Sequence, residues 1–109
     1  MDRERANSVY DLLRKKGMSR NKAKILALLE QVENARVDQI SRLLGINSSR
    51  ANQTLNYLLS LGYVQRMERK ETPGAGRSHH IYRLKMPVEE IIRGSANHVE
   101  VRIADDYEF

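Results

Sequence analysis

Residues 45–64, GINSSRANQTLNYLLSLGYV, combine a turn, a helix and the start of a strand. On a wheel at 100° per residue, the apolar residues of the helix fall on one face, which predicts that this face packs on a core. They are Ala51, Leu55, Leu58 and Leu59. The opposite face carries amides, hydroxyls and one guanidinium, whereas solvated helix faces are usually rich in Glu and Lys, which are better helix formers. Its composition favours a surface that hydrogen-bonds a ligand, although an ordinary solvated face of unusual composition is the alternative.

Three helices are predicted before this one. The first covers residues 3–16, where apolar residues recur at i, i+3, i+4 and i+7. Ser19 is expected to cap the second, which has a broad apolar face, and residues 35–37 could form a brief strand. Asp38 is the predicted N-cap of the third helix, and residues 45–47 form the next turn. The residues expected to face inward from the third helix are Ile40, Leu43 and Leu44, and the candidate caps of the fourth are Asn47 and Ser48.

After Gly62 the apolar pattern changes to alternation, which predicts two strands, residues 63–69 and 79–85. The loop between them, residues 71–78, contains one proline and two glycines, so the strands form a hairpin with a long tip. A last helix is predicted over residues 88–93. The remainder of the chain could be an added strand or an acidic tail.

This order of elements predicts a winged helix-turn-helix, a mainly α fold with a small β-hairpin and flanking helices at both ends. The third and fourth helices form the helix-turn-helix, and the hairpin is the wing. The 109 residues suit a single domain. It divides into an N-terminal helix (1–16), the winged helix-turn-helix (17–85) and a C-terminal helix with an acidic tail (86–109).

The charge of the chain is unevenly distributed. The net charge is +5, but residues 1–85 hold 17 Lys and Arg against 8 Asp and Glu, while residues 86–109 hold 2 against 6. A basic body favours a polyanionic partner such as nucleic acid, although the charge could also serve only solubility. Cysteine is absent, which excludes disulfides and thiolate metal sites. Without a signal peptide or a long apolar run, the chain is predicted to be cytoplasmic, with no membrane partner.

The polar face of the fourth helix suits the major groove of double-stranded DNA. Arginine pairs with guanine and Asn or Gln with adenine, while serines at a helix start can bind phosphate. The face consists of Ser49, Arg50, Gln53, Asn56 and Tyr57. The small residues at the wing tip allow close approach, so that an arginine beside them can contact phosphate or enter the minor groove. The predicted wing contacts are Arg66, Arg69, Lys70, Arg77 and Ser78.

The segment LGINSSRANQTLNYLLSLGYV resembles the helix-turn-helix of winged-helix regulators, and GMSRNKAKILALLEQ is similar to the opening helix of TrmB-like regulators. GAGRSHHIYRL resembles the wings of TrmB-like, MarR-like and PadR-like regulators. The resemblance covers about residues 17–85. It implies a dimeric transcriptional regulator that binds a pseudo-palindromic operator, and the effector stays unknown. It also implies recognition positions at Ser48, Ser49, Arg50, Asn52, Gln53 and Asn56, and a wing position at Arg77.

Two apolar stripes lie outside the predicted winged core, and in MarR-like relatives such flanking helices form the dimer interface. The resemblance therefore places a homodimer interface at Ala6, Val9, Tyr10, Leu13, Val88, Ile91 and Ile92. The alternative is that the stripes dock on the chain's own core.

No catalytic constellation and no cofactor motif is evident, so an enzyme is not predicted. The histidines are His79, His80 and His98, and a metal site built from them is the minority interpretation because adjacent strand residues point to opposite faces. Two other functions stay open. One is a winged-helix protein-interaction module of a transcription or replication assembly, and the other is a non-specific, chromatin-like DNA binder.

Overall fold

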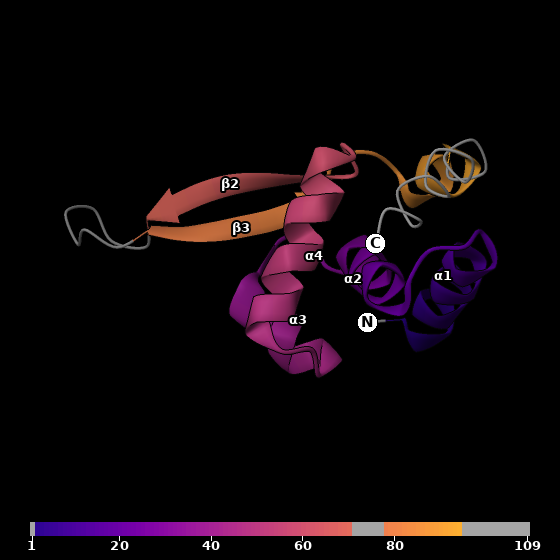
Figure 1. The fold of residues 1–109 in the computed structure, drawn as a ribbon, viewed down its shortest axis with the longest axis horizontal. Coiled ribbons are helices and arrows are strands. Elements are labelled where there is room, and N and C mark those ends of the chain that lie inside the picture. The colour runs from indigo at the N-terminus through magenta and orange to yellow at the C-terminus, as the bar shows by residue number, and fades with distance from the viewer. Residues whose placement is uncertain (1, 71–77, 95–109) are drawn as a thin grey trace, which may run out of the picture.

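A computed structural model describes residues 2–70 and 78–94 of the chain and has the winged-helix architecture (Figure 1). The elements in chain order are α1 (Arg3–Lys15), α2 (Arg20–Gln31), β1 (Ala35–Arg36), α3 (Val37–Leu44), α4 (Ser48–Ser60), β2 (Val64–Lys70) and β3 (Ser78–Leu84). Residues 88–94 are also helical. The predicted fold class is confirmed, and in Figure 1 the β2–β3 hairpin extends away from the helices. In the described part of the chain, no helix combines the length and the apolar character needed to cross a membrane.

The three strands form one antiparallel sheet in the order β1-β3-β2. The hairpin register runs from Val64 opposite Leu84 to Lys70 opposite Ser78. The brief strand predicted at residues 35–37 is present over Ala35–Arg36 as β1, and Val37 is already helical. Strand β1 pairs Ala35 with Tyr82 and so joins the start of the helix-turn-helix to the wing. Residues 71–77 of the predicted wing loop, 71–78, lie outside the described residues, and Ser78 is the first residue of β3.

The core is centred on α2, whose apolar face is too broad for α3 and α4 to cover alone. Six residues of this helix are buried, namely Ala23, Ile25, Leu26, Ala27, Leu28 and Leu29. Val9 and Leu13 of α1 pack in the same cluster, as do Val88 and Ile91 of the C-terminal helix. The flanking helices therefore complete the core of the winged domain.

This packing corrects part of the predicted dimer interface. Val9, Leu13, Val88 and Ile91 are each 1% exposed or less within a single chain, so their side chains are unavailable to a partner. The physical reason is that both stripes pack in the same buried cluster as the broad apolar face of α2. The other predicted interface residues, Ala6, Tyr10 and Ile92, are only half-buried.

An ionic cluster joins the two flanking helices on the surface of this core. Arg5 of α1 contacts Glu89 at 2.8 Å and Glu30 of α2 at 3.3 Å. The pKa of Arg5 is raised, chiefly by the hydrogen bond to Glu30 and then by that to Glu89. The pKa of Glu89 lies below its usual value of 4.5 because its own backbone N–H and Arg5 both donate to the carboxylate.

Helix α3 differs from its prediction at two positions. It begins at Val37 rather than after Asp38, because the Gln39 side chain accepts from the backbone N–H of Arg36 at 2.9 Å and closes the first turn. Leu43 was expected to face inward but is 59% exposed. Ile40 and the half-buried Leu44 define the inward face, and Leu43 is turned by about 100° from Leu44, its neighbour in sequence.

Candidate nucleic-acid interface

The turn between α3 and α4 fixes the direction of the fourth helix. Gly45 ends α3 with φ of 66° and ψ of 33°, a left-handed conformation that disfavours a side chain. Ile46 is buried, and its backbone N–H donates to the Ser41 carbonyl at 3.1 Å. The Ser41 hydroxyl in turn donates to the Ile46 carbonyl. A buried anchor and two hydrogen bonds therefore hold the turn in one geometry.

Asn47, rather than Ser48, caps α4. Its Oδ1 accepts from the backbone N–H groups of Ser49 at 2.8 Å and Arg50 at 3.3 Å. The side chain of Asn47 thus satisfies two of the donors that a helix start leaves free, and the hydroxyl of Ser48, the other candidate cap, donates to the Ser41 hydroxyl.

The rotation of α4 about its axis agrees with the helical wheel. Ala51, Leu55 and Leu58 are 0% exposed, and Leu59 is half-buried at the edge of the core. The opposite face is solvent-exposed at Ser48, Ser49, Arg50, Asn52, Gln53 and Asn56. Tyr57, also predicted to lie on that face, is half-buried at its border.

Apart from Ser48, the polar side chains of this exposed face have no partner among the described residues. Over residues 2–70 and 78–94, the side chains of Ser49, Arg50, Asn52, Gln53 and Asn56 form no hydrogen bond or ion pair. Other hydroxyls of the helix are engaged locally. Those of Thr54 and Ser60 donate to backbone carbonyls at 2.8 and 2.6 Å, and that of Ser48 donates to the Ser41 hydroxyl at 3.3 Å. The amides and the guanidinium are thus available to an external ligand.

A polar hollow beside this face brings in residues that sequence reasoning missed. Its volume is about 460 Å³, and its lining combines Arg50, Gln53 and Thr54 of α4 with Ser19, Arg20 and Asn21 at the start of α2. Ser19 is the N-cap of α2 but makes no side-chain capping bond, and the first turn has no acidic residue. The signal was the motif SRNK, which places basic residues where Asp or Glu would favour the helix dipole.

The aromatic ring of Tyr57 connects the same two helices. The ammonium of Lys22 lies 3.8 Å from the ring centroid, a cation–π contact between α2 and α4. The ring therefore lies beneath a cation, and the Lys22 charge is held at the edge of the polar face.

The wing contributes fewer described side chains. Arg66 is exposed on β2. Arg69 and Lys70 end the same strand and Ser78 begins β3, but the side chains of these three residues lie outside the description. Arg77 falls outside the described residues. On the hairpin surface, His80 and Glu68 lie 3.8 Å apart. Within the described ranges, no three His, Asp or Glu side chains gather as a metal site would require, and His98 falls outside them.

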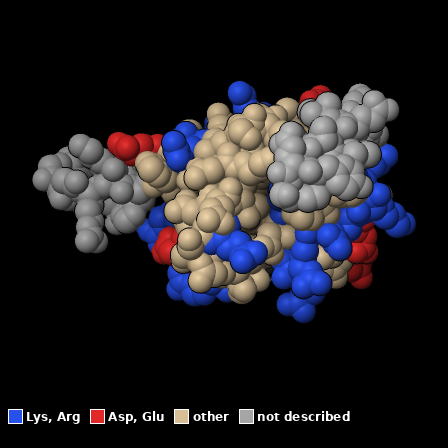
Figure 2. All heavy atoms as spheres, viewed as in Figure 1, with Lys and Arg blue, Asp and Glu red and all other residues tan. Residues whose placement is uncertain are grey.

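The surface around α4 is mixed in charge. In Figure 2, viewed as in Figure 1, the area over α4 is largely uncharged, and Lys and Arg side chains gather beside and below it. This arrangement combines neutral hydrogen-bonding groups at the centre with cations at the edge. Such a distribution suits a nucleic acid, in which neutral groups read base edges and cations contact the flanking phosphates.

Comparison with known proteins identifies the family. The family model described as the MarR family matches residues 16–78, more than half of the chain. The chain belongs to the MarR family. This membership confirms the predicted class, a winged-helix transcriptional regulator and not an enzyme. A search of curated proteins found no match.

Solved structures of MarR-like fold resemble the chain over most of its length. The Sulfolobus tokodaii protein ST1889 is 17% identical with a TM-score of 0.63, and the match covers 94% of this chain and 98% of that one. A transcriptional regulator of Thermotoga maritima is 21% identical with a TM-score of 0.57, over 94% and 70% of the two chains. A mutant MarR from E. coli, solved with operator DNA, is 14% identical with a TM-score of 0.60, over 94% and 71%.

Proposed function

We propose that this MarR-family chain regulates transcription in the cytoplasm by binding double-stranded DNA at specific sequences, with α4 in the major groove. The observation that carries the proposal is the exposed face of α4, whose Arg50, Asn52, Gln53 and Asn56 side chains have no partner among the described residues. Amide and guanidinium groups pair with base edges, and each good bidentate pair contributes about 1–3 kcal/mol of discrimination. The E. coli MarR mutant solved with operator DNA supports this assignment by analogy of fold.

Phosphate contacts are proposed on both sides of this helix. The start of α2 offers the Arg20 side chain and a helix N-terminus without a side-chain cap, beside Arg50 and Gln53 of α4. On the other side, the wing offers Arg66, Arg69, Lys70, Arg77 and Ser78. Such contacts set the orientation of the protein on the duplex, while the α4 amides select the sequence.

We also propose that two chains bind as a homodimer. Leu12, 44% exposed on α1, and the half-buried Ile92 of the C-terminal helix are apolar side chains at the surface of the flanking helices. Two-fold symmetry is the commonest symmetry of homo-oligomers, and it matches a pseudo-palindromic operator. Sedimentation equilibrium of the intact chain tests this. A dimer that Leu12→Asp dissociates supports the interface, and a monomer at concentrations well above those used for DNA binding contradicts it.

The main experiment is selection of fragments from a random double-stranded library, repeated at several salt concentrations and with competitor DNA. A regulator enriches one motif, and the preference persists in excess competitor. A chromatin-like binder holds all sequences equally, with an affinity that falls with salt. A protein-interaction module enriches nothing. Only the first result agrees with the proposal, because the exposed α4 face contributes base contacts in that case alone.

A further inference from the structure

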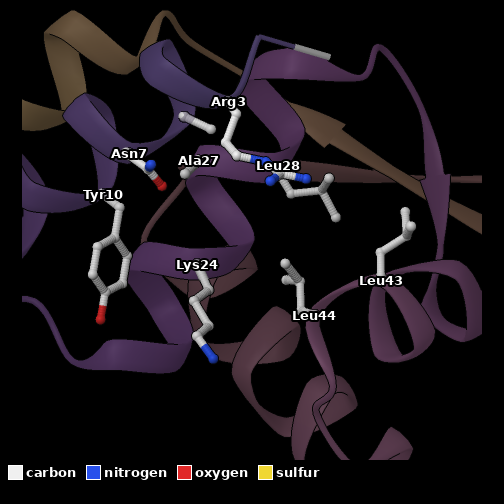
Figure 3. A pocket seen from close by; sticks show the side chains of 9 residues that line it. Arg3, Asn7, Tyr10, Lys24, Ala27, Leu28, Leu43 and Leu44 are labelled. Atoms are coloured by element: carbon white, nitrogen blue, oxygen red, sulfur yellow. The ribbon is translucent and has the colours of Figure 1, made fainter.

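A second hollow lies away from the α4 face, between α1, α2 and α3 (Figure 3). Its volume is about 580 Å³. Tyr10 of α1, Leu28 of α2 and both Leu43 and Leu44 of α3 form its apolar surfaces, and Lys24 lies among them in Figure 3. Leu43 is the leucine that the sequence pattern placed inward and the structure leaves 59% exposed. An apolar groove is thus exposed at a position where the sequence pattern predicted core.

Two cations border this groove. Arg3 lies on its α1 side and Lys24 on its α2 side. Neither forms an ion pair or a side-chain hydrogen bond with any other residue in the described ranges. Arg5, on the same helix as Arg3, is instead occupied by Glu30 and Glu89. The groove therefore suits an occupant that combines apolar rings with negative charge.

The chain itself contains such a segment. Residues 105–109, DDYEF, hold three carboxylates and two aromatic rings, and they belong to a C-terminal region of net charge −4 facing a body of +9. They lie outside the described residues, beyond Gly94, where the C-terminal helix is tied to α1 and α2 through Glu89 and Arg5. The ten intervening residues can span roughly 35 Å when extended. That length lets residues 105–109 reach surfaces well beyond the end of the C-terminal helix.

We propose that residues 105–109 dock in the groove between α1, α2 and α3 of their own chain. The rings of Tyr107 and Phe109 cover Leu28, Leu43 and Leu44, and the carboxylates of Asp105, Asp106 and Glu108 neutralise Arg3 and Lys24. Burying the rings removes apolar surface from water. The charge pairs favour residues 105–109 as the occupant over an apolar segment without carboxylates. The segment then braces α3 against α1 and α2. The proposal concerns a different surface from the DNA face and does not depend on DNA binding.

Paramagnetic relaxation in the intact protein tests the docking. Because the chain has no cysteine, Ala104→Cys provides a single site for a nitroxide label. We expect strong broadening of the Leu28, Leu43 and Leu44 methyl signals and little at Ile81, which lies in the wing hairpin. Equal, weak broadening at all four residues overturns the proposal. Tyr107→Ala with Phe109→Ala should reduce the broadening at Leu28 and Leu44 to the level of Ile81, and persistence of the broadening also overturns it.

Two further arms identify the occupant and the forces. Isotope-labelled chains without nitroxide, mixed with nitroxide-bearing unlabelled chains, should show no broadening. Broadening in this mixture means that a second copy supplies the segment, which contradicts the own-chain assignment. Lys24→Glu should weaken the broadening, and adding Asp105→Lys and Asp106→Lys should restore it. Failure of both charge changes to alter the signals removes the ionic part of the argument and overturns the proposed orientation.

Discussion

Removal of the Asn47 side chain tests how the recognition helix is held. Asn47→Ala deletes the acceptor for two backbone N–H groups, of which the 2.8 Å bond to Ser49 is well formed and the 3.3 Å bond to Arg50 is longer. Loss of such a cap costs about 1 kcal/mol, within a range of roughly 0.5–2. Asn52→Ala is the matched control, since it makes the same change five residues later, at an exposed position without a hydrogen bond.

The two alanine variants should differ by more than the cap alone. Alanine is a better helix former than asparagine, so Asn52→Ala should gain about 0.5 kcal/mol within the helix. The expected difference in the free energy of unfolding is therefore about 1.5 kcal/mol. With a urea dependence of about 2 kcal/mol per molar, typical of small proteins, the midpoints should lie about 0.7 M apart.

Urea unfolding followed by far-UV circular dichroism is the assay, because the chain has no tryptophan to report by fluorescence. Asn47→Asp should stay close to the parent, since a carboxylate accepts the same backbone hydrogen bonds. Equal midpoints for Asn47→Ala and Asn52→Ala would refute the capping argument. A loss in Asn47→Asp as large as in Asn47→Ala would refute it as well.

Three other expectations follow from the core, the ionic cluster and the hollow. Leu13→Ala should lower the free energy of unfolding by about 2–5 kcal/mol, because the side chain is 0% exposed. A loss below about 1 kcal/mol would contradict the burial of Leu13 in the core. Arg5→Ala should lower the free energy of unfolding at pH 7, and progressively less below about pH 4.5. The pKa of Glu89 is lowered, so its stabilising charge is lost as the carboxylate is protonated at acidic pH. A loss of stability in Arg5→Ala that does not vary with pH would contradict this. In DNA binding, Arg20→Ala should reduce the salt slope by about 1, and an unchanged slope would remove the start of α2 from the interface.

Local patterns predicted the elements well because each was determined by nearby residues. The leucine spacing in α4 gave its inward face, and the alternation after Gly62 gave the two long strands. The left-handed Gly45 and the buried Ile46 then placed α4 where the pattern indicated. The exposed polar face of α4 followed from the same spacing.

What the sequence could not supply depends on packing between distant segments. The apolar stripe of Val9 and Leu13 fits both a dimer interface and docking on the chain's own core. Only the breadth of the α2 face decides that a single chain buries it. Leu43 was misplaced because Leu43 and Leu44 both fit the spacing from Ile40, the buried residue of this eight-residue helix, so that only packing decides which leucine faces inward. Arg20 and Lys22 were missed because their proximity to Arg50 and Tyr57 is a tertiary contact.

The most direct test of the central claim is a comparison of base preference between the parent and two variants of the α4 face. The parent, Gln53→Ala and Asn56→Ala are each used to select sites from a random double-stranded library. Ser60→Ala serves as the control, because its hydroxyl already donates to the Tyr57 carbonyl. If α4 reads bases, each variant loses preference at defined positions, by about 1–3 kcal/mol of discrimination, while its affinity for random DNA is nearly unchanged. If both variants select the same sites with the preference of the parent, base recognition by this face is contradicted.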